Sequence, residues 1–167
     1  MTGRIFTADH HVYDLPPLLS WNVRHTGTVP CDSWSVTAVY QPEMLTVLRM
    51  AAGFAAIENG MTQLRGIVDE YTVELGSRGM TVTLSGRGYA ARLLDNESRP
   101  VTYEQVTLRE LIRCHAEPYG ISCEAAVDLR STVPYTAGVG ISQWKVISEF
   151  CRTYGGFLPR FAKTGEL

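Results

Sequence analysis

A glycine-rich turn is the most suggestive chemical pattern in the chain. Gly86, Gly88 and Ala91 match GxGxxA, the spacing with which a strand-to-helix turn holds the phosphates of a dinucleotide. Glu104 follows at about the distance of a ribose-binding acid. Such a turn follows a strand buried on both faces, whereas residues 80–85 alternate apolar and polar side chains as in an antiparallel sheet. We therefore expect a tight turn rather than a cofactor site, and a small nucleotide-binding enzyme stays an alternative reading.

Two adjacent histidines near the N-terminus are candidates for binding a metal. His10 and His11 are flanked by Asp9 and Asp14, and all four belong to residue types that ligate metals. Neighbouring side chains of an extended segment point to opposite faces, so the two histidines would not share one ion. The sequence therefore predicts a solvated N-terminal segment and no metal site.

Acidic residues in the middle of the chain could form a carboxylate pair for glycoside cleavage. Asp69, Glu70 and Glu74 lie in a run that alternates like a strand. On a strand, Glu70 and Glu74 share one face and Asp69 lies on the other. Because Thr72 points the same way as Glu70, we interpret this face as solvated and as a deterrent to edge pairing.

The other histidine, cysteine and glycine residues show no catalytic spacing. His115 and Glu117 belong to no HExxH or Cys–His signature, and we interpret His115 as a helix C-terminal residue whose charged form suits the helix dipole. Gly138 and Gly140 lack the lysine of a phosphate loop. We expect buried thiols, without a disulfide or zinc, at Cys31, Cys114, Cys123 and Cys151. No catalytic, cofactor-binding or metal-binding residue is predicted, and no interface residue is singled out.

The first part of the chain should form antiparallel strands. From residue 33 to 40 polar and apolar side chains alternate, and one face holds Trp34, Val36, Ala38 and Tyr40. Residues 41–43 open a short helix whose apolar stripe is Met44, Leu45, Leu48, Ala51 and Ala52. Asn59-Gly60 predicts a two-residue hairpin turn, because both positions tolerate a positive φ.

A long strand follows this turn. Its apolar positions are Leu64, Gly66 and Val68, and then Tyr71, Val73 and Leu75. Gly66 or Asp69-Glu70 should therefore bend the strand. Residues 76–79 turn the chain into a further strand with Met80, Val82 and Leu84 on one face. Consecutive strands joined by tight turns predict a small antiparallel barrel that closes on itself.

Helices should dominate the second part. A short helix is expected at 89–94, and Thr107 with Glu110 forms a capping box. The helix that it opens ends at Pro118 and Gly120, and its apolar face is Leu108, Leu111, Ile112 and Ala116. A second helix spans 142–154 and stops at Gly155-Gly156, and its apolar face is Trp144, Ile147, Phe150, Cys151 and Tyr154. Residues 157–161 then predict a strand and 163–166 a turn. The chain ends where the return strand should begin, so we expect the front portion of a longer protein or a partner strand from elsewhere.

Composition excludes several classes of protein. Of the 167 residues, 45% are hydrophobic and 19% charged, which is usual for a folded chain. The net charge of −2 comes without a basic block, so we expect no direct or sequence-specific nucleic-acid binding. Neither a membrane span nor a secretory signal is apparent, which predicts no membrane insertion and assembly in the cytoplasm. Thirteen of the 15 basic residues are Arg, and with eight Tyr and three Trp this favours burial against protein partners.

Residues 62–98 resemble the core of tail baseplate hub proteins of the late-control D type. In that family a G-V-V-D element, a V-S-G-R strand and a short helix ending in L-L-D follow one another. The corresponding segments here are GIVD at 66–69, LSGR at 84–87 and LLD at 93–95. Further segments look like the family's early strand and helix and its two later helices with a hairpin strand: 32–44, 106–121 and 143–167. The resemblance covers residues 32–167, and residues 1–31 match no part of the pattern.

The resemblance implies a fold and a function. Hubs of this family join the tail tube to the central spike, and they form homotrimers whose two barrels per subunit make a pseudo-sixfold ring. It implies a non-enzymatic virion component assembled in the bacterial host, with its own copies, tube protein, spike protein and other baseplate subunits as partners. The expected fold is α+β and mainly β, with an arm and first strands in 1–31, a barrel in 32–98, and a helical α+β portion with two helices and a hairpin strand in 99–167. The same motifs also allow a β-barrel adaptor of a related secretion or injection apparatus.

Overall fold

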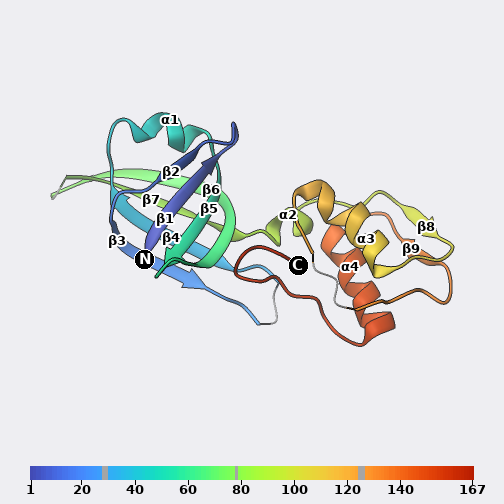
Figure 1. Cartoon of the computed structure of the whole chain (residues 1–167). Helices are drawn as coiled ribbons and strands as arrows, with labels where there is room; N and C mark the ends of the chain where they lie inside the picture. The colour runs from blue at the N-terminus through green and yellow to red at the C-terminus, as the bar shows by residue number, and fades with distance from the viewer. Residues whose placement is uncertain (28–29, 78, 124–126) are drawn as a thin grey trace. The chain divides into compact units, whose positions relative to one another are not determined.

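The structure is a computed structural model that describes residues 1–27, 30–77, 79–123 and 127–167. The chain divides into two units, Met1–Tyr89 and Ala90–Leu167. Seven strands and the short helix α1 make up the first unit, and the helices α2, α3 and α4 lie in the second (Figure 1), so the chain is α+β and mainly β. Within the described ranges no helix is long and apolar enough to cross a membrane.

One antiparallel sheet of seven strands forms the first unit, in the order β2-β1-β5-β6-β7-β4-β3. Its elements are β1 (Thr2–Thr7), β2 (Val12–Asp14), β3 (Leu18–Arg24), β4 (Ser33–Val39), α1 (Met44–Arg49), β5 (Ala51–Glu58), β6 (Met61–Gly76) and β7 (Gly79–Gly88). The predicted meander β5-β6-β7 is confirmed. Asn59 and Gly60 both have positive φ, 51° and 77°, and make the predicted hairpin turn. In the second turn Gly76 pairs with Gly79, and Arg78 lies outside the described residues.

The core of this unit lies on one face of the sheet. Trp34, Val36 and Ala38 of β4 are buried, as their alternation predicts, and the Trp34 ring stacks on Phe54 with 3.8 Å between ring centroids. The stripe expected on α1 is right only for Met44 and Leu48. The helix ends at Arg49, so the two alanines after it belong to β5, and Leu45 is 37% exposed.

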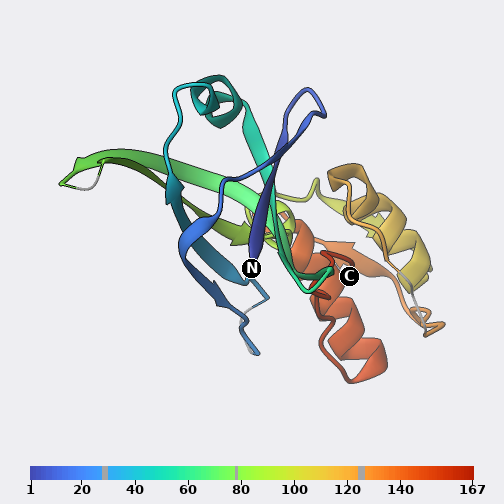
Figure 2. The same cartoon turned by 60° about the vertical axis from the view of Figure 1, so that its left-hand side comes forward.

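The sheet curls around this core without closing into a barrel (Figures 1 and 2). Only residues 15–17 separate β2 from β3, so the ends of the two edge strands are at most about 14 Å apart. No ladder nevertheless joins β2 to β3 among the described residues. β2 is three residues long, and Pro16 and Pro17 after it have no N–H to donate. The prediction of a closed barrel is therefore wrong, and both edges stay open.

A β-bulge divides β6 into two halves. The pairing with β7 shifts between Val68 and Glu70, so Asp69 is the additional residue and the predicted bend at this position is confirmed. Before the bulge the core side of the strand carries even-numbered residues such as Leu64, which pairs with Ala56. After it the core side carries odd-numbered residues, since Val73 pairs with buried Val82.

Helices and a two-stranded sheet make up the second unit. Its elements are α2 (Ala91–Leu94), β8 (Val101–Tyr103), α3 (Leu108–His115), the 3-10 helix η1 (Glu117–Tyr119), β9 (Tyr135–Ala137), α4 (Gln143–Phe150) and the π-helix η2 (Cys151–Gly155). The capping box at α3 is confirmed, because Thr107 accepts from the Glu110 N–H and Glu110 accepts from the Thr107 N–H. The predicted apolar face of α3 is buried. β8 and β9 pair with each other and have no counterpart in the sequence-based prediction.

The end of the chain departs from the prediction. Ser142 caps α4 as its position suggests, and after Phe150 the chain continues as the π-helix to Gly155, with Gly156 at φ 69°. The strand expected at 157–161 is wrong, because these residues join no ladder among the described strands. Pro159 has no N–H for a ladder and lines an apolar pocket instead. The turn at 163–166 is confirmed by the Gly165 N–H, which donates to the Ala162 carbonyl oxygen.

Candidate functional site

The glycine-rich segment serves strand packing. Gly86 lies in β7, where a Cβ would overlap the Ile67 carbonyl oxygen and lie 2.9 Å from the Trp34 ring. That oxygen accepts a hydrogen bond of 3.1 Å from Trp34 Nε1. The Gly88 N–H donates to the Asp32 carbonyl oxygen at 2.8 Å. The preceding strand is thus antiparallel to both neighbours and faces the core on one side, which is not the setting of a dinucleotide turn.

The acidic and histidine candidates near the N-terminus are divided among separate contacts. Asp9 contacts the Thr7 hydroxyl and lies 3.0 Å from His11 Nδ1, whereas Asp14 pairs with Arg4 at 2.6 Å across β1 and β2. The Thr7 hydroxyl, more than His11, holds the pKa of Asp9 below its ordinary value. His10 takes a positive φ of 68° in the turn between these strands. Within the ranges that the structure covers, no three such side chains gather as a metal site would require.

The mid-chain carboxylates hold the bulge of β6 against β7. Asp69 accepts two hydrogen bonds from the Arg87 guanidinium, at 2.8 and 2.9 Å. Glu70 accepts one of 3.0 Å from the Ser85 hydroxyl. Glu70 and Glu74 are exposed, which confirms the solvated face. These contacts join β6 to β7 and use the two carboxylates to stabilise the strand pair.

The cysteines and His115 differ most from expectation. None of the four cysteines forms a disulfide with another described residue, but only Cys151 is buried and Cys114 is exposed, so the expectation of four buried thiols is wrong. Burial, and then the nearby Cys123, raises the pKa of Cys151 to about 11. His115 is the last residue of α3, as predicted, yet it is 5% exposed. It lies one turn after Leu111 on the apolar face, and this spacing is the signal that could have predicted its burial.

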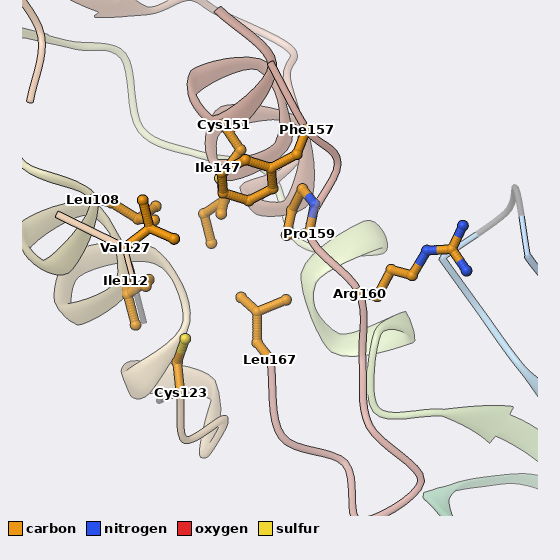
Figure 3. A pocket seen from close by; sticks show the side chains of 10 residues that line it. All are labelled: Leu108, Ile112, Cys123, Val127, Ile147, Cys151, Phe157, Pro159, Arg160 and Leu167. Carbon is orange, nitrogen blue, oxygen red and sulfur yellow. The ribbon is translucent and has the colours of Figure 1, made fainter. Parts of the chain in front are cut away.

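An apolar pocket of about 200 Å³ lies between α3, α4 and the last residues of the chain (Figure 3). Ile112 and Ile147 approach it from the two helices, and Leu167 points toward it from the C-terminal segment. The Leu167 N–H donates to the Ser122 carbonyl oxygen at 3.0 Å, which fixes this segment in place. The segment thus adds to the core of the second unit.

Open strand edges are the remaining candidate site. β3 is an edge strand of the described sheet, and Trp21 lies on its core-facing side opposite buried Val36 but is 49% exposed. The outer half of β6, residues 68–76, pairs only with β7 within the described sheet, since β5 pairs no further than Ile67. Figure 2 shows this half projecting with β7 as a long hairpin. Its edge therefore presents backbone donors and acceptors that another strand could use.

The projecting hairpin also presents apolar side chains. Leu75 and Met80 are paired across it and are 81% and 42% exposed. They continue the core-facing side of the sheet, because Val73 and buried Val82 form the neighbouring pair. We call β3, residues 68–76 and Met80 the open-edge surface. An exposed apolar pair beside an unpaired strand edge is typical of a protein-binding site.

Solved structures of tail proteins share this fold. The tail protein from Neisseria meningitidis MC58 matches with a TM-score of 0.72 and 13% identity, over 99% of this chain and 48% of that one. The 43 kDa tail protein of prophage MuSo2 from Shewanella oneidensis matches with a TM-score of 0.71 and 14% identity, over 99% of this chain and 52% of that one. This chain spans about half the length of each, and at such identity the likeness shows the fold alone. The sequence matches no protein-family profile and no curated protein.

Proposed function

We propose that the chain is a structural subunit of a phage or phage-like tail, and within it a baseplate hub of the late-control D type that joins the tail tube to the central spike. The observation that carries the proposal is the fold shared with two tail proteins over 99% of the chain. The order of the sequence motifs supports the finer assignment, because GIVD lies in β6, LSGR in β7 and LLD at α2. The function is assembly, without catalysis.

The open-edge surface suggests how copies would assemble. A ring requires a heterologous contact, in which one surface of a subunit binds a different surface of the next. β3 and the outer half of β6 are two unlike edges of one sheet. Addition of one edge to the other would satisfy their backbone groups and bury Trp21, Leu75 and Met80. We propose a homotrimeric ring formed in this way, with tube and spike proteins bound on its two sides.

Native mass spectrometry tests this proposal. The expected species is a trimer, or a monomer that joins rings when tube protein from the same gene cluster is added. Leu75→Asp should weaken the assembly, because it places a charge in the proposed contact. Met61→Asp is the matched control, since Met61 is 64% exposed at the other end of β6. A chain that stays monomeric alone and with tube protein contradicts the proposal, and secretion genes in place of tail genes beside its own would favour the adaptor function.

A further inference from the structure

A cavity of about 600 Å³ lined by both polar and apolar atoms lies within the second unit. Residues from β8, α3, η1 and the start of α4 line it, together with the segment before β8. The side chains that matter for its chemistry are Tyr103, His115, Tyr119, Gln143 and Arg99. Their hydrogen bonds determine which groups remain able to bind a ligand.

The orientation of Gln143 follows from its neighbours. Its Nε2 donates to the Glu97 carbonyl oxygen and to the Tyr119 hydroxyl, both at 3.0 Å. A flipped amide would place two acceptors against each other at Glu97, so Nε2 must lie on this side. Oε1 then faces His115 Nδ1 at 2.5 Å, and this nitrogen must carry a hydrogen. Gln143 is therefore a positioning residue with all its polar atoms used.

This orientation assigns the hydrogens of both tyrosines. With Nδ1 protonated, a neutral His115 accepts at Nε2, so the Tyr103 hydroxyl donates to it at 3.0 Å. The Tyr119 hydroxyl accepts from Gln143, and its own hydrogen meets no acceptor within the part of the chain that the structure describes. The cavity thus has one hydroxyl donor held in place and unused.

A cation lines the same cavity. Arg99 is exposed, and its guanidinium makes no hydrogen bond or ion pair with any described residue. The carboxylate in the lining, Glu97, already accepts a hydrogen bond of 2.8 Å from the Gly140 N–H. Arg99 therefore gives the cavity a positive charge that no described residue neutralises, and the Tyr119 hydroxyl adds a donor.

We propose that this cavity binds a carboxylate group through the Arg99 guanidinium and the Tyr119 hydroxyl. A guanidinium matches the two oxygens of a carboxylate, and the hydroxyl supplies a further donor. A volume of about 600 Å³ also accommodates the carbon skeleton of a small organic acid or an acidic side chain with its backbone. The site is independent of the proposed tail function.

Titration of the isotope-labelled chain with sodium succinate, followed by two-dimensional NMR at constant ionic strength, tests the proposal. Saturable shifts should occur at the amides of Arg99 and Tyr119 with a Kd on the order of 1 mM. N-acetyl-Gly-Glu-Gly-amide is the second probe. Tighter binding of the peptide identifies an acidic side chain of a partner protein as the ligand, and tighter binding of succinate identifies a small acid.

Three variants make the test specific. Arg99→Gln and Tyr119→Phe should each weaken binding about tenfold, because each removes a donor to a charged group. Arg109→Gln, which changes an exposed arginine of α3 outside the cavity lining, should bind as the parent does. Thermal melts show whether Tyr119→Phe is folded. Arg99→Gln changes an exposed side chain and should leave the fold intact. Absence of saturable shifts with both probes, or unchanged binding by Arg99→Gln, overturns the proposal.

Discussion

One methyl group at Gly86 should destabilise the first unit. A Cβ there would overlap the Ile67 carbonyl oxygen and press on the Trp34 ring, which is stacked on Phe54 in the core. The backbone of β7 or β6 must therefore move. The Trp34 Nε1 hydrogen bond to Ile67 would lengthen or break as a result.

Three contributions determine the magnitude of the Gly86→Ala effect. Overpacking of a dense core costs about 1–3 kcal/mol. Loss of the Trp34 hydrogen bond adds about 1 kcal/mol. Alanine lowers the conformational entropy of the unfolded chain, which offsets about 0.4–1 kcal/mol of the loss in stability. The net loss is about 2 kcal/mol, which corresponds to a fall in Tm of about 8–16 °C for a unit of this size.

Urea unfolding measures this loss. Far-UV circular dichroism reports the sheet, and tryptophan fluorescence includes the buried Trp34. Gly27→Ala is the matched control in the same unit, because no described atom lies within 4 Å of a Cβ at Gly27. Its free energy of unfolding should stay within about 0.5 kcal/mol of the parent. If the free energy of unfolding of Gly86→Ala is as close to the parent as that of this control, the close approach of β7 to Ile67 does not require glycine at this position.

Three further predictions concern the second unit. Thr107→Ala removes the cap of α3 and should lower the free energy of unfolding by about 1 kcal/mol in urea titrations. Burial raises the pKa of Cys151 to about 11 and that of Tyr135 to about 12, so the folded state keeps protons that the unfolded chain releases from about pH 9 upward. Stability should therefore fall between pH 9 and 11, and a Tm that is constant over this range would contradict the assignment. His115→Leu should lower the free energy of unfolding in urea titrations by about 1–3 kcal/mol, because buried Gln143 Oε1 loses its hydrogen-bond donor. An unchanged urea midpoint would mean that water replaces the imidazole.

Local chemistry made part of the fold predictable from sequence. Asn59-Gly60 determines its turn through backbone conformations that few residues adopt. The capping box at Thr107 involves atoms three residues apart. The phases of β4 and β6 follow from the alternation of side chains along single strands. Each of these predictions depends on residues that are close neighbours in the chain.

Contacts between distant segments were beyond such reasoning. Closure of the barrel depends on whether β2 and β3 pair, and the short β2 with Pro16 and Pro17 prevents it. Leu75 was placed correctly on the apolar side of β6, but its exposure depends on where β5 stops pairing. Residue type alone predicts a charged histidine at the end of α3, whereas the spacing of His115 from Leu111 places it on the buried face. The cavity that it lines requires Tyr103 and Gln143, which lie 12 and 28 residues away.

The bulge at Asp69 has a consequence for recognising distant relatives. A strand without this residue would keep its inward side chains in a single parity from Leu64 to the end of the hairpin. Such a sequence, aligned here without a gap, would match hydrophobic positions to polar ones over half of β6, even if every core contact were equivalent. A one-residue deletion opposite Asp69 restores the correspondence, so homology searches that permit a gap at this position should detect relatives that rigid alignment misses.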